Sequence, residues 1–399
     1  MSALAERWNL DERRFSWLYG EKHSEERVTF DEKTGFWNVH TYADALHVLN
    51  SPHVFSSGTG RLIPERSEFD EGTITQLDPP RHTALRKLVS SAFSPRAIND
   101  LEPRVHAIVD HLLDKLAGAR EFDVATEFAY PLPITLITEM LGVPASDHSV
   151  INGWVDQMLS GTTEYSLVDR DGVDEELGDV MAAARHLTDY LRDLVRERRG
   201  RSGDDLLTRL TEAEVDGERL TENETVNFAN TMLVAGHITT TLLIGSTVLC
   251  LDAFPDAQRA VREDRSLVPS LLEESLRYLP PIASAVRVTN SPVELAGTTI
   301  GADQMVGVWI PSVNRDEAVF TDPYTFDPAR QPNPHLSFGH GIHFCIGAAL
   351  ARREGVIAVN ALLDRFPDLR CDPGTPPTFM TSPNLNGVTR LPVVVGQPH

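Results

Sequence analysis

The chain is short of cysteine and of positive charge. Its 399 residues include 3 cysteines, and 58 Asp and Glu outnumber 36 Lys and Arg, which gives a formal net charge of -22. Three widely spaced thiols are too few for a disulfide framework and form no Cys-x-x-Cys module, so a reducing cytoplasm is expected. The acidic excess opposes binding to nucleic acid and to anionic membranes, because their phosphates would be repelled.

Long apolar runs are also missing. No run of about 20 apolar residues is available to cross a bilayer. The first residues, MSALAERWNLDERRFSW, contain no apolar core of a signal peptide, so a cytoplasmic protein without a membrane anchor is expected. Hydrophobic residues still make up 41% of the chain and charged residues 24%, which is typical of a globular protein with a large core.

The residue pattern divides into helical and strand-like stretches. Helical periodicity dominates from about residue 80 to 280 and again at about 347–366, and short strands are expected at about 25–60, 286–310 and 387–395. We interpret residues 1–399 as one mainly α domain with a smaller β portion.

One helix is expected to run through the centre of the molecule. Thr221 and Glu224 form a capping-box pattern, and no proline follows until Pro255. About 30 helical residues would span roughly 45 Å. Residues 231–247 carry no Asp, Glu, Lys or Arg, so this part should be buried on nearly all sides.

The segment Phe338-Gly-His-Gly-Ile-His-Phe-Cys345-Ile-Gly347 is the strongest chemical signal. Its glycines allow sharp turns and close approach to a flat ligand. Cys345 precedes a predicted helix, whose N-terminal dipole favours a thiolate over a thiol. The residues alone leave open a buried structural cysteine, or a zinc site with His340 and His343, although that spacing lacks the usual paired ligands.

This segment resembles the haem-binding loop of cytochromes P450, F-G-x-G-x-H-x-C-x-G, and matches it at every fixed position. Further P450-like stretches occur in the expected order: Leu77-Asp-Pro-Pro80, Glu274-Ser-Leu-Arg277, Asn314-Arg-Asp316 and Phe326-Asp-Pro-Ala-Arg330. The resemblance implies a cytochrome P450 fold, with haem b (iron-protoporphyrin IX) between the long central helix and the helix after the Cys loop.

The resemblance also implies roles for particular residues. Cys345 would be the iron ligand, with Phe338 and Gly347 beside the haem. The haem propionates would be bound by His82, Arg86, Arg287 and His343, although each of these, taken alone, could be a solvated surface charge. A structural network supporting the Cys loop would consist of Glu274, Arg277 and Arg330.

Ala235-Gly236-His237-Ile238-Thr239-Thr240 lies in the middle of the central helix and resembles the P450 oxygen-binding motif. Gly236, next to Ala235, would make room for dioxygen, and Thr239 would hydrogen-bond it and help to deliver protons. A threonine that only bonds back to its own helix is the alternative.

The motif departs from the family pattern at Ile238, where an acidic residue is usual. His237 is titratable and is a candidate substitute, but its side chain should point about 100° away from that of Ile238. Three further hypotheses are a relay through water or substrate, slow or uncoupled turnover, and peroxide-driven chemistry that needs no relay.

By the same resemblance, the substrate pocket is formed by residues at about 56–75, 160–173, 234–235, 282–285 and 384–385. Specific pocket candidates are Val234, Ile282, Ala283 and Leu385. The acidic segment at 160–173 is either a mobile lid that favours a cationic substrate or a solvated loop. The remaining lining is apolar, which suits a medium or large hydrophobic molecule.

Electrons are expected from a ferredoxin and an NAD(P)H-dependent ferredoxin reductase, because no flavin or iron–sulfur segment is evident. An acidic ferredoxin would dock on the basic residues Arg81, Arg86, Lys87, Arg96, Arg104, Arg352 and Arg353.

The expected function is that of a monomeric monooxygenase. It would insert one oxygen atom of O2 into a lipophilic small molecule, such as a macrolide or other polyketide. A peroxygenase or an enzyme of oxidative coupling or desaturation is the second hypothesis, and a haem-thiolate sensor or ligand carrier is the third.

Overall fold

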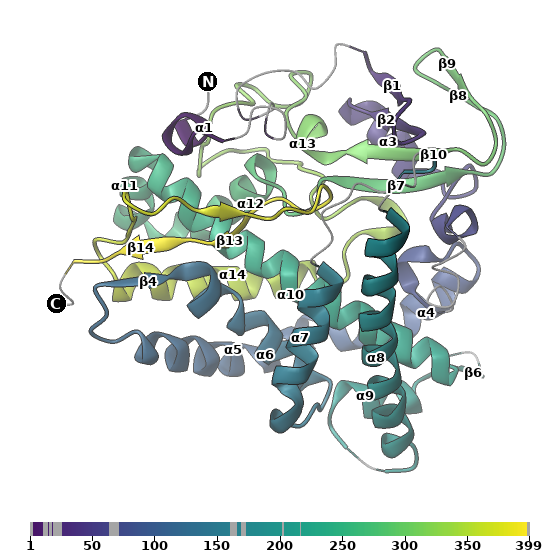
Figure 1. The fold of residues 1–399 in the computed structure, drawn as a ribbon, viewed down its shortest axis with the longest axis horizontal. Helices are drawn as coiled ribbons and strands as arrows, with labels where there is room; N and C mark the ends of the chain where they lie inside the picture. Colours follow the sequence, from purple (N-terminus) through teal and green to yellow (C-terminus); the bar gives the residue numbers. More distant parts are fainter. Residues whose placement is uncertain are drawn as a thin grey trace.

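The structure is a computed structural model that describes residues 3–10, 15, 18, 26–63, 72–159, 166–168, 173–201, 203–215 and 217–396. Helices make up most of it, and strands form a smaller part, at the upper right and at the left of Figure 1. The prediction of a mainly α fold with a β portion is therefore confirmed. The larger helices besides those introduced below are α5 (Pro95–Lys115), α7 (His148–Leu159), α8 (Val173–Arg198) and α11 (Pro255–Glu263).

The predicted central helix is α10 (Glu222–Ala253), with 32 residues and a length of about 48 Å. Thr221 and Glu224 form the expected capping box: each side chain accepts a hydrogen bond from the backbone N–H of the other. By length and composition α10 could cross a membrane, but 78% of its most apolar window is buried inside the structure. This burial is that of a core helix.

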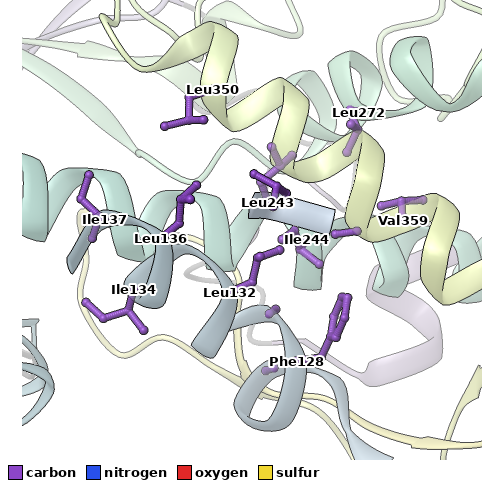
Figure 2. Packing of buried hydrophobic residues seen from close by; sticks show 14 of the residues in the cluster. Phe128, Leu132, Ile134, Leu136, Ile137, Leu243, Ile244, Leu272, Leu350 and Val359 are labelled. Atoms are coloured by element: carbon purple, nitrogen blue, oxygen red, sulfur yellow. The ribbon is translucent and has the colours of Figure 1, made fainter. Parts of the chain in front are cut away.

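The main core lies where α10 meets α6 (Pro131–Met140), α14 (Ala348–Arg365) and α12 (Val268–Tyr278). Figure 2 shows Leu132 of α6, Leu243 of α10 and Leu350 of α14 among the buried side chains that fill this space. Each such side chain contributes roughly 1.5–3 kcal/mol by its removal from water. The packing holds α10 and α14, the two helices that border the site, in a fixed relation.

Five strands form the largest sheet, in the order β1 (Val28–Asp31), β2 (Phe36–Val39), β10 (Met305–Trp309), β7 (Ser284–Thr289) and β3 (Phe55–Ser56). β10 runs parallel to β2, and the other pairs are antiparallel. Strands were expected in all of these regions, and the sheet brings the N-terminal residues beside those near 300.

A second sheet joins β4 (Glu121–Asp123), β14 (Pro392–Val394) and β11 (Arg370–Cys371). β4 lies inside the stretch where only helical patterns were recognised. Its pairing with the C-terminal strand is set by tertiary contact, because three residues with one exposed side chain give no periodic signal.

Candidate active site

The loop that carries Cys345 is shaped by glycine. Gly339 and Gly341 have φ of 71° and 70°, a region that residues with a side chain rarely adopt. A Cβ atom at Gly341 would also lie 2.7 Å from the backbone oxygen of Leu49. The Cys345 N–H donates to the Phe338 carbonyl at 2.9 Å, which closes the loop three residues before α14 begins.

The Cys345 thiol responds to opposing influences. Burial raises its pKa, while the backbone N–H groups of Gly347 and Ala348 and the charges of Arg86 and Arg352 lower it. Burial prevails and the net pKa shift is upward. The backbone N–H groups at the start of α14 act in the predicted direction, toward the thiolate, and a bound cation such as iron would lower the pKa of Cys345 further.

A buried ion pair lies behind this loop. Arg277 donates from Nε to Glu274 Oε2 at 2.8 Å and from Nη2 to Glu274 Oε1 at 2.7 Å, and both side chains are fully buried. Arg330 adds a third charged group, with Nε 3.1 Å from both carboxylate oxygens. The three residues of the predicted network are thus in contact.

The network holds irregular backbone in place. Arg277 also donates to the carbonyl oxygens of Asn314, Pro323 and Thr325. Asn314 in turn binds the segment that leads into the Cys loop: its amide donates to Ser337 Oγ at 2.9 Å and its oxygen accepts from Leu336 N at 2.8 Å. These contacts fix the start of the Cys loop relative to α12.

A cavity of about 530 Å³ separates the Cys loop from α10. Cys345 lines it from the loop, and Gly236 and Thr239 line it from α10. Of the other predicted site residues, those that line the same cavity are Ala235, Arg86, Arg287, Phe338, His343, Gly347 and Ile282.

Basic side chains gather at one end of this cavity. The rings of His82 and His343 lie with centroids 4.2 Å apart, and His343 Nε2 is 2.9 Å from Ser57 Oγ. Arg287 donates to the neighbouring Val286 carbonyl at 2.8 Å. Ser57 lies in the predicted 56–75 segment, but its contact with His343 was not predicted, because a single serine in a loop has no sequence signature.

These basic side chains are held away from water. Burial lowers the pKa of Arg287 and Arg86, and together with nearby positive charges it lowers that of His343 to about 3. Both ring nitrogens of His82 are buried and have no hydrogen-bond partner among the described residues. Buried donors of this kind fit a ligand with anionic oxygens, as the two propionates of haem would supply.

On the α10 side, Gly236, Thr239, Thr240 and Leu243 form one helix face along the cavity. Thr239 Oγ1 donates to the Ala235 carbonyl at 2.7 Å, so it bonds back to its own helix while facing the cavity. A Cβ at Gly236 would meet no neighbour closer than 3.8 Å, so helix packing does not demand glycine there.

The side chains of the two residues before Thr239 do not line the cavity among the described residues. Ile238 is 7% exposed and packs in an apolar cluster with Leu242, Met380 and Leu385. His237 is fully buried against Tyr130, with ring centroids 4.3 Å apart, and burial lowers its pKa to about 4. His237 is not part of the cavity lining among the described residues, so it does not replace an acid there.

The predicted pocket residues are only partly placed at the cavity. Ile282 lines it, but Val234, Ala283 and Leu385 are not among the described lining residues. Val234 packs against the main core, Ala283 is fully buried, and Leu385 lies behind Ile282 in an isolated β-bridge. Of the proposed lid at 160–173, the structure describes only residues 166–168 and 173. Of the 56–75 segment, it describes residues 56–63 and 72–75.

Other apolar lining residues come from α6 and from the turns of α10 outside its motif. They are Pro133, Leu136, Ile137, Phe228, Met232 and Leu243. Each looks like an ordinary core residue in the sequence, because a helix face toward a cavity and one toward a neighbour have the same pattern.

The predicted ferredoxin-docking residues are less available than their sequence suggests. Arg104 pairs with Glu139 at 2.5 Å, Arg352 with Glu273 at 2.7 Å and Arg353 with Glu102 at 2.5 Å. Arg81 pairs with both Glu218 and Glu224. Internal carboxylates therefore neutralise much of this basic surface.

The family model of cytochrome P450 matches residues 27–393. The chain belongs to the cytochrome P450 family. This P450 is 42% identical over 363 residues to cyclomarin C epoxidase CymV of Salinispora arenicola, covering 90% of each chain. It is 41% identical over 379 residues to the erythromycin C-12 hydroxylase of Saccharopolyspora erythraea, covering 93% of this chain and 92% of that one.

Solved structures agree with the family assignment. The crystal structure of HmtN, a post-tailoring hydroxylase of himastatin biosynthesis, matches this P450 with a TM-score of 0.88 and 47% identity, covering 99% of this chain and 100% of that one. The P450 fold is thereby confirmed, and the protein is a haem-dependent monooxygenase.

Proposed function

We propose that this P450 inserts one oxygen atom of O2 into a lipophilic secondary metabolite. The observation that carries the proposal is that Cys345 and Thr239 line the same cavity, one from the Cys loop and the other from α10. When bound, haem supplies the redox chemistry that cleaves O2. Cys345 would ligate its iron, while His82, Arg86, Arg287 and His343 would hold its propionates.

The α10 face and the apolar walls have separate tasks in this proposal. Gly236 leaves room for dioxygen, and Thr239 passes a proton to it. Phe228, Met232, Ile137 and Ile282 exclude water and contact apolar parts of the substrate. The relatives named above include a cyclomarin C epoxidase, an erythromycin C-12 hydroxylase and a hydroxylase of himastatin biosynthesis, which supports a macrolide, another polyketide or a similar secondary metabolite as substrate.

We infer a cytoplasmic monomer that receives electrons from NAD(P)H through a ferredoxin reductase and a ferredoxin. The protein would be tested with a ferredoxin and its reductase, NADPH and a panel of macrolides and other polyketides. Binding would be followed by the shift of the haem absorption band and products by mass spectrometry. We expect oxygenated product with one atom from ¹⁸O2, and NADPH consumption without any oxygenated product would contradict the proposal.

Peroxide-driven chemistry is the second candidate, and Ile238 is the observation that favours it. Its apolar surroundings provide no acid next to Thr239. Hydrogen peroxide carries its own protons, so a peroxygenase would not need one. Faster product formation with peroxide than with NADPH and redox partners would favour this candidate, whereas the reverse would support the monooxygenase.

A further inference from the structure

A second hollow lies behind the wall of the haem cavity. It is an open groove of about 670 Å³ at the surface, between α5, α6 and α9 (Leu206–Glu212). Its apolar lining residues are Ala92, Ala97, Leu101, Leu136, Met140 and Leu206. Among the described residues, Leu136 alone lines both this α5–α6–α9 groove and the haem cavity. At this point one leucine side chain separates the two spaces.

Leu136 lies where two faces of α6 meet. Pro133 and Ile137 line the haem cavity, whereas Glu139 and Met140 line the groove. Residues three and four apart share a helix face, so Leu136 shares one with Pro133 and another with Met140. The Leu136 side chain is therefore in contact with both hollows, although it is only 1% exposed to solvent.

On the inner side, α6 borders the oxygen-binding stretch of α10. A Cβ atom at Gly236 would lie 3.8 Å from the Cδ1 atom of Ile137, the residue after Leu136. Gly236 and Thr239 line the same cavity as Leu136. Figure 2 shows Leu136 and Ile137 beside α10. A small molecule that passed Leu136 would thus enter the cavity on the side where dioxygen is proposed to bind.

On the outer side, the groove has a charged rim. Arg104 of α5 pairs with Glu139 of α6 at 2.5 Å, and both line the groove. Arg96 and Arg209 also line it and are exposed. Water covers charged groups of this kind, so dissolved gas reaches the outer side of Leu136.

The wall between the two hollows is apolar. Leu136 belongs to the main core, and Phe93, which lines the cavity, follows Ala92, which lines the groove. Such a wall opposes water and ions, because they would lose their hydrogen bonds in crossing it. Dioxygen and carbon monoxide have no such bonds to lose. Met140 has a flexible side chain on the groove side, which gives Leu136 room to change rotamer.

We propose that Leu136 is the gate through which dioxygen passes from the α5–α6–α9 groove to the haem. The inference rests on the proposed function, in which a large lipophilic substrate occupies the cavity beside Thr239. Such a substrate would block the path by which it entered, whereas a route past Leu136 stays open to a diatomic gas. No bond forms or breaks in this step.

Carbon monoxide rebinding after flash photolysis of the ferrous, haem-loaded protein measures gas entry directly. We expect Leu136→Ala to raise the bimolecular rate by about threefold or more, and Leu136→Phe to lower it by about as much. Ile137→Ala is the matched control, because it enlarges the cavity without touching the groove. It should change the rate by less than about 1.5-fold. An equal effect of the two alanine variants, or no effect at Leu136, would overturn the proposal.

A second test leaves the core untouched. Ala97 is half-buried in the groove and does not line the cavity, so Ala97→Cys can carry a bulky maleimide there. Cys250 and Cys371 are buried and Cys345 would be bound to iron, so the new thiol reacts selectively. We expect the label to slow carbon monoxide rebinding by about threefold.

The control for this label is Arg259→Cys on α11, outside the groove. Its labelled and unlabelled forms should rebind carbon monoxide at the same rate. A labelled Ala97→Cys protein that rebinds as fast as its unlabelled form would overturn the proposal, even if Leu136→Ala rebinds faster than wild type.

Failure of this inference can be told apart from failure of the proposed function. Carbon monoxide rebinding needs haem but neither a substrate nor turnover. If the wild type forms no product from O2 with any substrate tested, the proposed function fails and the rebinding rates still decide the role of Leu136. With a substrate that is oxygenated, Leu136→Phe should raise the KM for O2 by about threefold. An unchanged KM for O2 would overturn the inference alone.

Discussion

Arg277 and Glu274 form a two-bond ion pair in which neither side chain is exposed to solvent. The pair lies under the chain that leads into the Cys loop, and through Asn314 it holds the segment before Phe338. The geometry of the Cys loop therefore depends on a charge pair that lies outside the cavity lining among the described residues.

Glu274→Gln should leave the Arg277 and Arg330 charges without their carboxylate. Because breaking a buried pair strands a charge, we expect a loss of about 3–5 kcal/mol in the free energy of unfolding, together with poor haem incorporation. Urea denaturation and the haem-to-protein absorbance ratio would measure both. The neighbouring Glu273→Gln, whose partner Arg352 is partly exposed, is the control and should cost less than about 1 kcal/mol.

Arg287→Leu should weaken haem retention. Its guanidinium is buried beside His343, where it donates to the Val286 carbonyl, so removal of a charged donor should cost about 1.5–3 kcal/mol of haem binding. This corresponds to roughly 10-fold to 150-fold faster haem transfer to an apoprotein acceptor. Arg61→Leu, which removes contacts to Thr289 and Asn290 on the outside of the sheet, should leave the transfer rate unchanged. Equal rates in all three proteins would show that Arg287 holds no propionate.

Thr239→Ala should uncouple electron use from product formation, because in the proposed function this hydroxyl passes a proton to dioxygen. We expect product per NADPH to fall by about tenfold or more, with a matching rise in hydrogen peroxide. Thr241→Ala is the control, since its hydroxyl bonds to the Ala129 and His237 carbonyls inside the protein. If Thr239→Ala forms as much product per NADPH as wild type, the only role of the Thr239 hydroxyl is its hydrogen bond to the Ala235 carbonyl.

Lys87 and Arg96 offer a direct test of the electron-transfer surface. Both are exposed, on α4 (Arg81–Ser90) and α5. The double variant Lys87→Glu, Arg96→Glu should raise the KM for an acidic ferredoxin by about tenfold, because electrostatic steering of the ferredoxin is lost. The increase in KM should be smaller at high salt, which screens the charges. Arg259→Glu on α11, at the far end of the molecule in Figure 1, should have little effect. Loss of activity in Arg259→Glu alone would place the docking surface elsewhere.

The sequence predicts the fold well where the signal is local. The capping box at Thr221 and the uncharged stretch behind it define α10, and the glycines around Cys345 define the loop. Pairings between distant segments, such as β4 with β14, could not be predicted, because three-residue strands have no pattern of their own.

At the site, most predicted residues that belong to a recognised motif line the cavity, whereas of the four specific pocket candidates only Ile282 does. Val234 and Ala283 neighbour lining residues but face the core or are wholly buried, since one step along a helix or strand turns a side chain away. Leu136 carries no local signal in the sequence. Only its position between the cavity and the groove shows that it is unusual.

The role of Cys345 as iron ligand is tested most directly by the absorption spectrum of the ferrous, carbon-monoxide-bound protein. Wild type should show the long-wavelength band of a thiolate-ligated haem, and Cys345→His should retain haem but show the shorter-wavelength band of a histidine-ligated one, with no oxygenase activity. A long-wavelength band that persists in Cys345→His would contradict the account, because the thiolate would then come from another residue.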